Sequence, residues 1–421
     1  MMIATAQSFV PRASPSAGSL RALDAVNFFV AASLAGFGPF VAVFLGEQTW
    51  SQEEIGLVLS IGAAAGLLAQ VPGGELLDVV RSKCFLIALG MVMVGLSAGI
   101  IALWPAFAPV CVALVLQGVT GGFLGTAITS ISLGLVGHDL LSERLGRNQC
   151  FRSIGSLAAA AILGAVGYFL SNRAIFFATA LFVLPALAAL GRINADDIHF
   201  GQSVGAPDHH LTTEPSRARR RQFWRDRGLL TLACSLFLFQ MADAAILPLI
   251  GGTLAKTEGS RSALIMSVLL VVPQIVVALM APWAGRRAKT WGRRPLLIIG
   301  FSVVPARALA FAMTTDPVIL AAVQVLDGIS GAVLGVLQAL IIADLTIGTG
   351  RFNFVQGLVG VASGIGASVS TTLFGLIADS LGRSVAFLAI SVTGLLAVVV
   401  VWFFMPETRP SLSLHRNVVH V

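Results

Sequence analysis

Residues 117–125 read QGVTGGFLG and residues 327–335 read DGISGAVLG, so one glycine-rich pattern occurs twice at an offset of 210 residues. The matching pairs are Gln117 and Asp327, Gly118 and Gly328, Gly121 and Gly331, and Gly125 and Gly335. Pro72 and Pro282 share the same offset. Both segments lie in long apolar stretches, where glycines three and four residues apart allow close helix packing. The repeat predicts a helical protein with two equivalent halves.

The composition is that of a protein whose surface faces lipid. Of the 421 residues, 56% are hydrophobic and only 11% are charged, with a mean hydropathy of +0.89. Because soluble domains carry about 25% charged residues, an ordinary soluble enzyme is excluded. The net charge is +7, but the basic residues lie between apolar runs instead of on one solvated face. We therefore expect a lipid bilayer and no nucleic acid as partner.

Apolar stretches of about 20 residues, long enough to cross roughly 30 Å of hydrocarbon, recur from one end of the chain to the other. We expect twelve spans, at residues 23–45, 55–74, 84–104, 108–136, 153–171, 174–191, 229–252, 263–284, 295–313, 317–342, 355–378 and 384–405. The sequence thus predicts an all-α polytopic membrane protein. Its twelve transmembrane helices should form two six-helix bundles related by an internal pseudo-two-fold repeat.

Lysine and arginine are distributed unevenly over the two sides of this topology. With a cytoplasmic N-terminus, the inner segments hold 22 of the 27 basic residues, the outer loops four, and one span the last. Arg144, Arg147 and Arg152 are assigned to the inner loop between the fourth and fifth spans. Such a positive-inside bias predicts that both termini are cytoplasmic, in a multi-pass protein of the cell membrane.

The longest polar stretch divides the chain. We expect an N-terminal tail at 1–20, bundles at 21–193 and 228–405, a cytoplasmic linker at 194–227 and a C-terminal tail at 406–421. The basic end of the linker, with Phe223 and Trp224 among its arginines, is either a plain topology signal or an interfacial helix on the anionic inner leaflet.

The loop after the second span resembles a hallmark of the major facilitator superfamily, Gly-xxx-Asp-Arg-x-Gly-Arg-Arg/Lys. In GELLDVVRSK, Gly74, Asp78 and Lys83 match this pattern, whereas Val79 and Arg81 depart from it. The second copy, GRRAKTWGRR, keeps the following residues: Gly285, Gly292, Arg293 and Arg294. The resemblance, which extends over about residues 21–405, implies that these cytoplasmic gating loops latch the two bundles through helix-end charges. A solvated loop charge is the alternative for Asp78.

Two further family patterns survive in part. The fourth span keeps Gln117-Gly118 of Arg-xx-Gln-Gly, with Leu114 at the Arg position, and the fifth keeps Gly164 and Gly167 of the Gly-Pro-xx-Gly-Gly of drug-efflux members. The resemblance implies that spans one, four, seven and ten line a central cavity. Its candidate substrate and coupling residues are Asn27, Gln117, Gln240, Asp243 and Asp327.

Three charged residues stand out near the middle of spans, where each costs at least about 2.5 to 3.5 kcal/mol on insertion scales. Arg307 and Asp327, in the ninth and tenth spans, come to similar depths, so we expect an intramembrane ion pair that is either structural or opens during transport. Asp243 has no obvious partner. Burial should favour its protonated form, which makes it the first candidate for proton coupling; alternatively Gln240 or Arg307 holds it without titration.

These features predict a secondary transporter that moves a small, partly apolar solute by alternating access with proton coupling, efflux being slightly favoured. The alternatives are a proton symporter or facilitator for metabolite uptake, a transport-inactive membrane sensor or assembly protein, and a membrane-embedded enzyme. The chain lacks GxxxxGK[ST] and HExxH, so we expect no nucleotide, metal or cofactor. We also expect no catalytic activity. We also expect a monomer.

Overall fold

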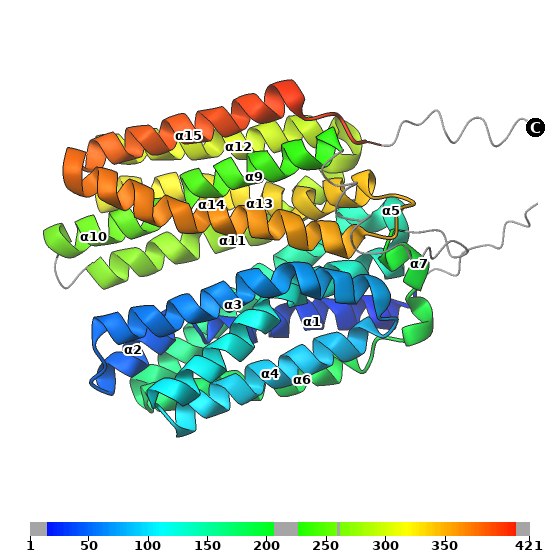
Figure 1. The fold of residues 1–421 in the computed structure, drawn as a ribbon, viewed down its shortest axis with the longest axis horizontal. Coiled ribbons are helices and arrows are strands. Elements are labelled where there is room, and N and C mark those ends of the chain that lie inside the picture. The colour runs from blue at the N-terminus through cyan, green and yellow to red at the C-terminus, as the bar shows by residue number, and fades with distance from the viewer. Residues whose placement is uncertain (1–14, 206–225, 259–261, 410–421) are drawn as a thin grey trace, which may run out of the picture.

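A computed structural model describes residues 15–205, 226–258 and 262–409, and this part of the chain is helical without strands. The expected tails at 1–20 and 406–421 and most of the linker fall largely outside the described residues. Figure 1 shows the helices as two groups lying side by side, one built from each half of the chain.

The first bundle is formed by α1 (Ala17–Ala35), α2 (Pro39–Glu47), α3 (Gln52–Val79), α4 (Lys83–Leu103), α5 (Phe107–Phe169) and α6 (Asn172–Leu190). The second is formed by α9 (Arg227–Asp243), α10 (Ile246–Glu258), α11 (Ser262–Trp291), α12 (Arg293–Met313), α13 (Pro317–Leu345), α14 (Phe352–Leu381) and α15 (Arg383–Phe404). Helices α1 and α2, and likewise α9 and α10, together make one span each. Because α5 contains two spans, the described helices cross twelve times, as expected.

Local signals set several helix ends. A capping box starts α3, in which the Ser51 hydroxyl accepts from the Glu54 amide while the Glu54 carboxylate accepts from the Ser51 amide. Asp316 caps α13 just before a proline at the first helical position. Gly292 has a φ of 92°, which lets α11 and α12 join through a single residue.

Helix α5 shows that the expected loop between the fourth and fifth spans is wrong. Residues 138–152 are not a loop but continue the helix, and only Gly137, with φ 66° and ψ −178°, is non-helical between the fourth and fifth spans. We call the segments on either side the first limb (107–136) and the second limb (138–169) of α5. Polar residues do not end the helix here because their side chains face other helices instead of lipid. Arg144, Arg147 and Arg152 therefore lie within the bundle.

Each bundle has its own apolar core. One cluster of buried side chains comes entirely from residues 22–193, and the other comes from the second half together with Leu133, Leu141 and Leu145 of α5. Large apolar side chains also point outward, and Leu68, Leu279 and Phe403 are 71 to 77% exposed. Such a surface is stable only against hydrocarbon.

The two bundles meet most closely at the end where α1 begins and α15 ends, which we call the terminal end; the opposite end is the far end. There α3 packs on α14, and the second limb of α5 packs on α11. Glycines allow the backbones to touch: a methyl group on Gly146 would lie 2.5 Å from the Ala281 carbonyl oxygen.

The beginning of the expected linker packs beneath both bundles at the terminal end. It forms η1 (Ala195–Asp197) and α7 (Phe200–Ser203). The Ser130 hydroxyl donates to the Ser203 carbonyl at 2.6 Å, and the Phe352 amide donates to the Val204 carbonyl at 3.2 Å. Hydrogen bonds from Ser19 and Ser16 keep the pKa of Asp197 below its usual value.

Candidate functional site

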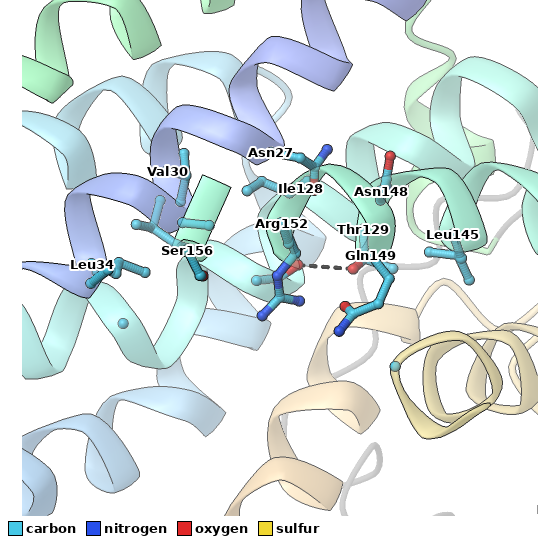
Figure 2. A pocket seen from close by; sticks show the side chains of 16 residues that line it. Asn27, Val30, Leu34, Ile128, Thr129, Leu145, Asn148, Gln149, Arg152 and Ser156 are labelled. Atoms are coloured by element: carbon cyan, nitrogen blue, oxygen red, sulfur yellow. Dashed lines mark hydrogen bonds between the residues drawn. The ribbon is translucent and has the colours of Figure 1, made fainter. Parts of the chain in front are cut away.

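Three adjoining cavities of about 370, 540 and 200 Å³ lie where the bundles face one another. The 370 Å³ cavity is lined mainly by α1 and both limbs of α5, with Gly335 of α13 closing it from the second bundle (Figure 2). The 200 Å³ cavity adds α3, α13 and α14 to its walls. All three share Gly121, so the glycine face of the repeated segment lines one region between the bundles.

Among the expected site residues, Asn27 lines the 370 Å³ cavity and Gln117 the 540 Å³ cavity. The Asn27 amide donates to the Leu23 carbonyl at 2.8 Å, but its buried oxygen accepts no hydrogen bond. The side-chain oxygens of Gln70 and Gln356, which line the 200 Å³ cavity, are also buried without a partner. Buried polar atoms without partners are costly, so these oxygens are available to a ligand or to water.

Arg152 is the one charged residue among those that line the three cavities. The sequence predicts it in a loop, whereas the structure places it inside α5. It lines both the 370 Å³ and the 200 Å³ cavities. Its side chain is exposed to this space and makes no hydrogen bond or ion pair within the part of the chain that the structure describes. Fifteen residues after Gly137, it lies about 22 Å along the second limb, near the middle of the membrane span. No carboxylate lines any of the three cavities.

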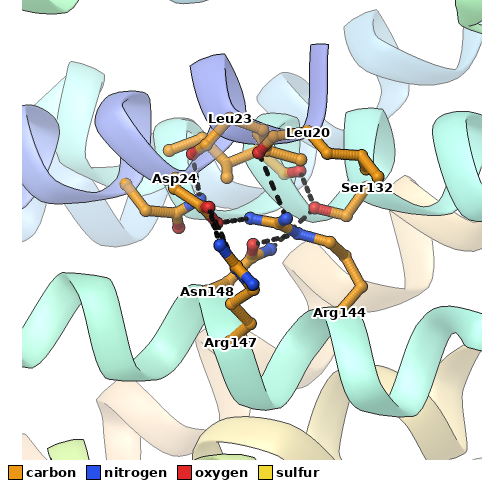
Figure 3. A network of polar contacts seen from close by, with 9 residues as sticks. Leu20, Leu23, Asp24, Ser132, Arg144, Arg147 and Asn148 are labelled. Atoms are coloured by element: carbon orange, nitrogen blue, oxygen red, sulfur yellow. Dashed lines mark hydrogen bonds and ion pairs between the residues drawn. The ribbon is translucent and has the colours of Figure 1, made fainter. Parts of the chain in front are cut away.

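The neighbouring arginines of α5 are fully engaged (Figure 3). Asp24 of α1 accepts from Arg147 at 2.6 Å and also binds the buried Arg144. Arg144 donates to Asn148 at 2.7 Å, and Asn148 donates in turn to Ser132 on the first limb at 2.7 Å. This network joins α1 to both limbs of α5. Both of its arginines contact the Asp24 carboxylate, whereas Arg152 contacts no carboxylate among the described residues.

A second charged cluster lies inside the second bundle. Arg307 of α12, whose side chain is only 1% exposed, contacts Asp327 of α13 and lies 2.8 Å from the Asp243 carboxylate at the end of α9. The expectation that Asp243 lacks a partner is therefore wrong, because α12 brings Arg307 between the two carboxylates. Gln240 is half-buried one turn before Asp243. None of these four residues lines the three cavities.

The residues expected in gating loops lie mostly in helices at the terminal end. Gly74 is inside α3 and Gly285 inside α11, whereas Lys83 begins α4. Asp78 reaches across to the second bundle: its carboxylate accepts from the backbone amides of Asn353 and Phe354 at 3.1 and 2.9 Å. It thereby caps the first turn of α14.

Three basic residues of these segments make contacts within their own bundle. The buried Lys83 ammonium donates to the Leu77 carbonyl at 2.6 Å. Arg293 lies 2.9 Å from Asp344, and Arg294 donates to the Trp402 carbonyl. Gly292 allows the Glu407 carboxylate to approach the start of α12 closely. The contacts between the bundles are made by Asp78 in the first copy of the motif and by Lys289 in the second, which lies 2.6 Å from Glu143 of α5.

A signal for the site on α5 was present in the sequence. The polar residues Arg144, Asn148, Arg152 and Ser156 follow one another at intervals of four, which places them on one helix face. This periodicity continues into the fifth apolar stretch and indicates an inward-facing stripe. Averaged hydropathy does not register it, because the average ignores which face carries the charges.

Twelve apolar spans in two bundles, with a polar cavity between them, define a membrane transporter. The sequence profile of the Major Facilitator Superfamily matches residues 23–256 and 232–419. An uncharacterized MFS-type transporter of Mycobacterium tuberculosis is 34% identical over 395 residues, which cover 93% of this chain and 94% of that protein. The chain belongs to the Major Facilitator Superfamily.

Two more distant likenesses extend this comparison. The class B tetracycline resistance protein of Escherichia coli is 28% identical over 142 residues, 34% of this chain and 35% of that protein. The crystal structure of the human organic anion transporter MFSD10 superposes with a TM-score of 0.71 and covers 91% of this chain and 98% of that one. At 13% identity, the second likeness shows the fold alone.

Proposed function

We propose that this protein is a proton-coupled secondary transporter that moves a small, partly apolar solute by alternating access. The solute site is the cavity region between the bundles, whose walls combine glycine and aliphatic side chains with a few amides. Sites at the interface of two repeats are a recurring feature of such transporters. Rocking of the bundles about this region would expose it to one side of the membrane at a time.

The Arg307 cluster carries the proposal of proton coupling. One guanidinium lies between the carboxylates of Asp243 and Asp327, whose side chains remain about one quarter exposed. With all three groups ionised the cluster has a net charge of −1 inside the membrane, where an unbalanced charge is costly. Binding one proton removes that charge without separating the ion pair. Of the two carboxylates, Asp243 is the better proton acceptor, because it is the last residue of α9, just before the break to α10.

We further propose that the terminal end faces the cytoplasm of a cell bounded by this membrane, and that export is the direction of transport. The excess of basic residues in segments at the terminal end supports this orientation. Partial identity to a tetracycline resistance protein supports export. Since the structure is closed at the terminal end, it corresponds to a state that faces outward in this orientation.

The test is solute flux in proteoliposomes with and without an imposed pH gradient, using a panel of radiolabelled metabolites and drugs. Wild type is compared with Asp243→Asn, which keeps the size of the side chain but removes the proton site. Asp379→Asn is the matched control, because Asp379 is exposed near the far end of α14. We expect gradient-dependent flux in wild type and control, and a loss of at least tenfold in Asp243→Asn.

Each other result removes part of the proposal. Flux that ignores both the gradient and the substitution would make the protein a facilitator. Gradient-dependent accumulation on the terminal side would make it an uptake symporter. No flux of any compound would contradict transport and favour a sensor or assembly role.

A further inference from the structure

The guanidinium of Arg152 faces the region between the bundles, and no carboxylate among the described residues pairs with it. An arginine near the middle of a membrane span is costly unless a carboxylate, a carbonyl or water balances it. Its own bundle offers no free carboxylate nearby: Glu143 lies 2.6 Å from Lys289, and Asp24 is bound by two other arginines. A position that is costly for folding and faces a cavity is typical of a binding residue.

The described residues of the second bundle do not offer Arg152 a free carboxylate either. Across the 200 Å³ cavity from Arg152 are α13 and α14, which present Gln338, Gln356 and three glycines. The carboxylates of that bundle nearest in depth, Asp243 and Asp327, are bound to Arg307. A negative partner of Arg152 would therefore come from outside the described residues, and the cavity is where it would enter.

The surroundings of Arg152 narrow the chemistry of that partner. Figure 2 shows the ends of Arg152 and Gln149 pointing to the same side of α5, and both residues line the 370 Å³ cavity, so a guanidinium and an amide are both available to a ligand there. A guanidinium presents two parallel N–H groups that match the two oxygens of a carboxylate. The remaining wall of the 370 Å³ cavity is largely aliphatic, with Val30, Leu124 and Ile128 among its residues. A single cation does not suit a polyphosphate.

We propose that the transported solute is an organic monoanion, an amphiphilic carboxylate whose charged group binds Arg152 and whose apolar part lies against α1 and the first limb of α5. This inference deepens the proposed transport function and rests on it. It makes Arg152 the residue that determines the charge of the solute. It also accounts for the lack of a partner for this arginine among the described residues.

The test is equilibrium binding to the purified full-length protein in detergent and low-chloride buffer, which needs neither flux nor a gradient. The probes are a panel of aromatic and aliphatic carboxylic acids, each paired with its neutral carboxamide, together with chloride and inorganic phosphate. Stabilising compounds are found by thermal shift, and dissociation constants of the best pairs follow by calorimetry. Transport can fail while binding succeeds, so this result and that of the flux assay are separable.

We expect acids to bind at least tenfold more tightly than their amides. Arg152→Gln should weaken the acid about 10- to 100-fold, to the level of its amide, since a hydrogen bond to a charged group is lost. Arg152→Lys should keep part of the preference because it keeps the charge. Arg173→Gln is the matched control: it removes the same charge from an exposed site at the start of α6, outside the cavities, and should change nothing.

Several results would overturn the proposal. They are equal binding of acid and amide, stabilisation by chloride or phosphate alone, no acid bound at all, and unchanged acid binding in Arg152→Gln. If Arg152→Gln does not fold, the acid and amide comparison in wild type and the Arg152→Lys variant decide. A loss of flux in Arg152→Gln with intact acid binding would instead indicate that Arg152 pairs with a protein carboxylate in another state.

Discussion

Replacing Asp78 by asparagine should open the terminal end of this transporter. The Asp78 carboxylate accepts three hydrogen bonds from the start of α14: from the backbone amides of Asn353 and Phe354 and from the Asn353 side chain at 2.9 Å. All three join opposite bundles, so they exist only while the terminal end is closed. Their loss therefore acts on the balance between closed and open states.

The size of the effect follows from the acceptors that remain. Asparagine keeps one acceptor oxygen and turns the other into a donor, which then faces a backbone N–H. At least one charged hydrogen bond, worth about 1.5 to 3 kcal/mol, is lost, and another weakens to about 0.5 to 1.5 kcal/mol. Together this is roughly 2.5 to 4.5 kcal/mol, which shifts the ratio of closed to open states about 60- to 1,600-fold.

The shift can be measured as a distance between spin labels. We would label Arg81 and Ile347, two exposed positions at the terminal end on opposite bundles, in a background without the four native cysteines. Asp78→Asn should move the distance distribution towards longer values, whereas Asp379→Asn, at the other end of α14, should leave it unchanged. If the distributions of wild type and Asp78→Asn coincide in the folded protein, the hydrogen bonds of Asp78 do not hold the terminal end closed.

Two predictions concern stability and are checked by thermal unfolding in detergent. Gly137→Ala should lower the free energy of unfolding by about 1 to 3 kcal/mol, because the backbone of Gly137 lies in a region that other residues rarely adopt. The control Gly164→Ala, inside the second limb with open space around it, should be neutral or slightly stabilising. Equal losses of stability in the two variants would contradict the argument. Arg307→Gln should lower the free energy of unfolding by about 3 to 5 kcal/mol, because it leaves two carboxylates unbalanced. Adding Asp327→Asn to this variant should restore part of the lost stability. An unfolding midpoint of Arg307→Gln equal to that of wild type would show that the cluster is not ionised.

The fold could be predicted from the sequence because its main determinants are averages over long segments. A stretch of 20 apolar residues can only span a bilayer as a helix, and the repeat at an offset of 210 residues predicts two bundles. The breaks within α1–α2 and α9–α10 were not predicted. They involve a few residues near Gly38 and Ala244, too short a change to alter an average.

The candidate site was less predictable because it depends on which residues meet in space. Asp243 and Arg307 are 64 residues apart, and nothing in the sequence specifies that α12 brings this arginine to the end of α9. Arg152 was hidden for the opposite reason. Charges near an apolar stretch indicate a loop when only their number is considered, whereas their spacing of four along α5 indicates a helix face.

The two proposals together imply that solute and proton act on one equilibrium. Arg152 is an unbalanced positive charge in the first bundle, and the Arg307 cluster is an unbalanced negative charge in the second. Closing the cavity removes water from between the bundles and makes both charges more costly. An anion on Arg152 and a proton on Asp243 each remove one of them. Each ligand alone therefore lowers the cost of closing the cavity, so the protein can change sides with solute bound in one direction and with a proton bound in the other, as export in exchange for protons requires.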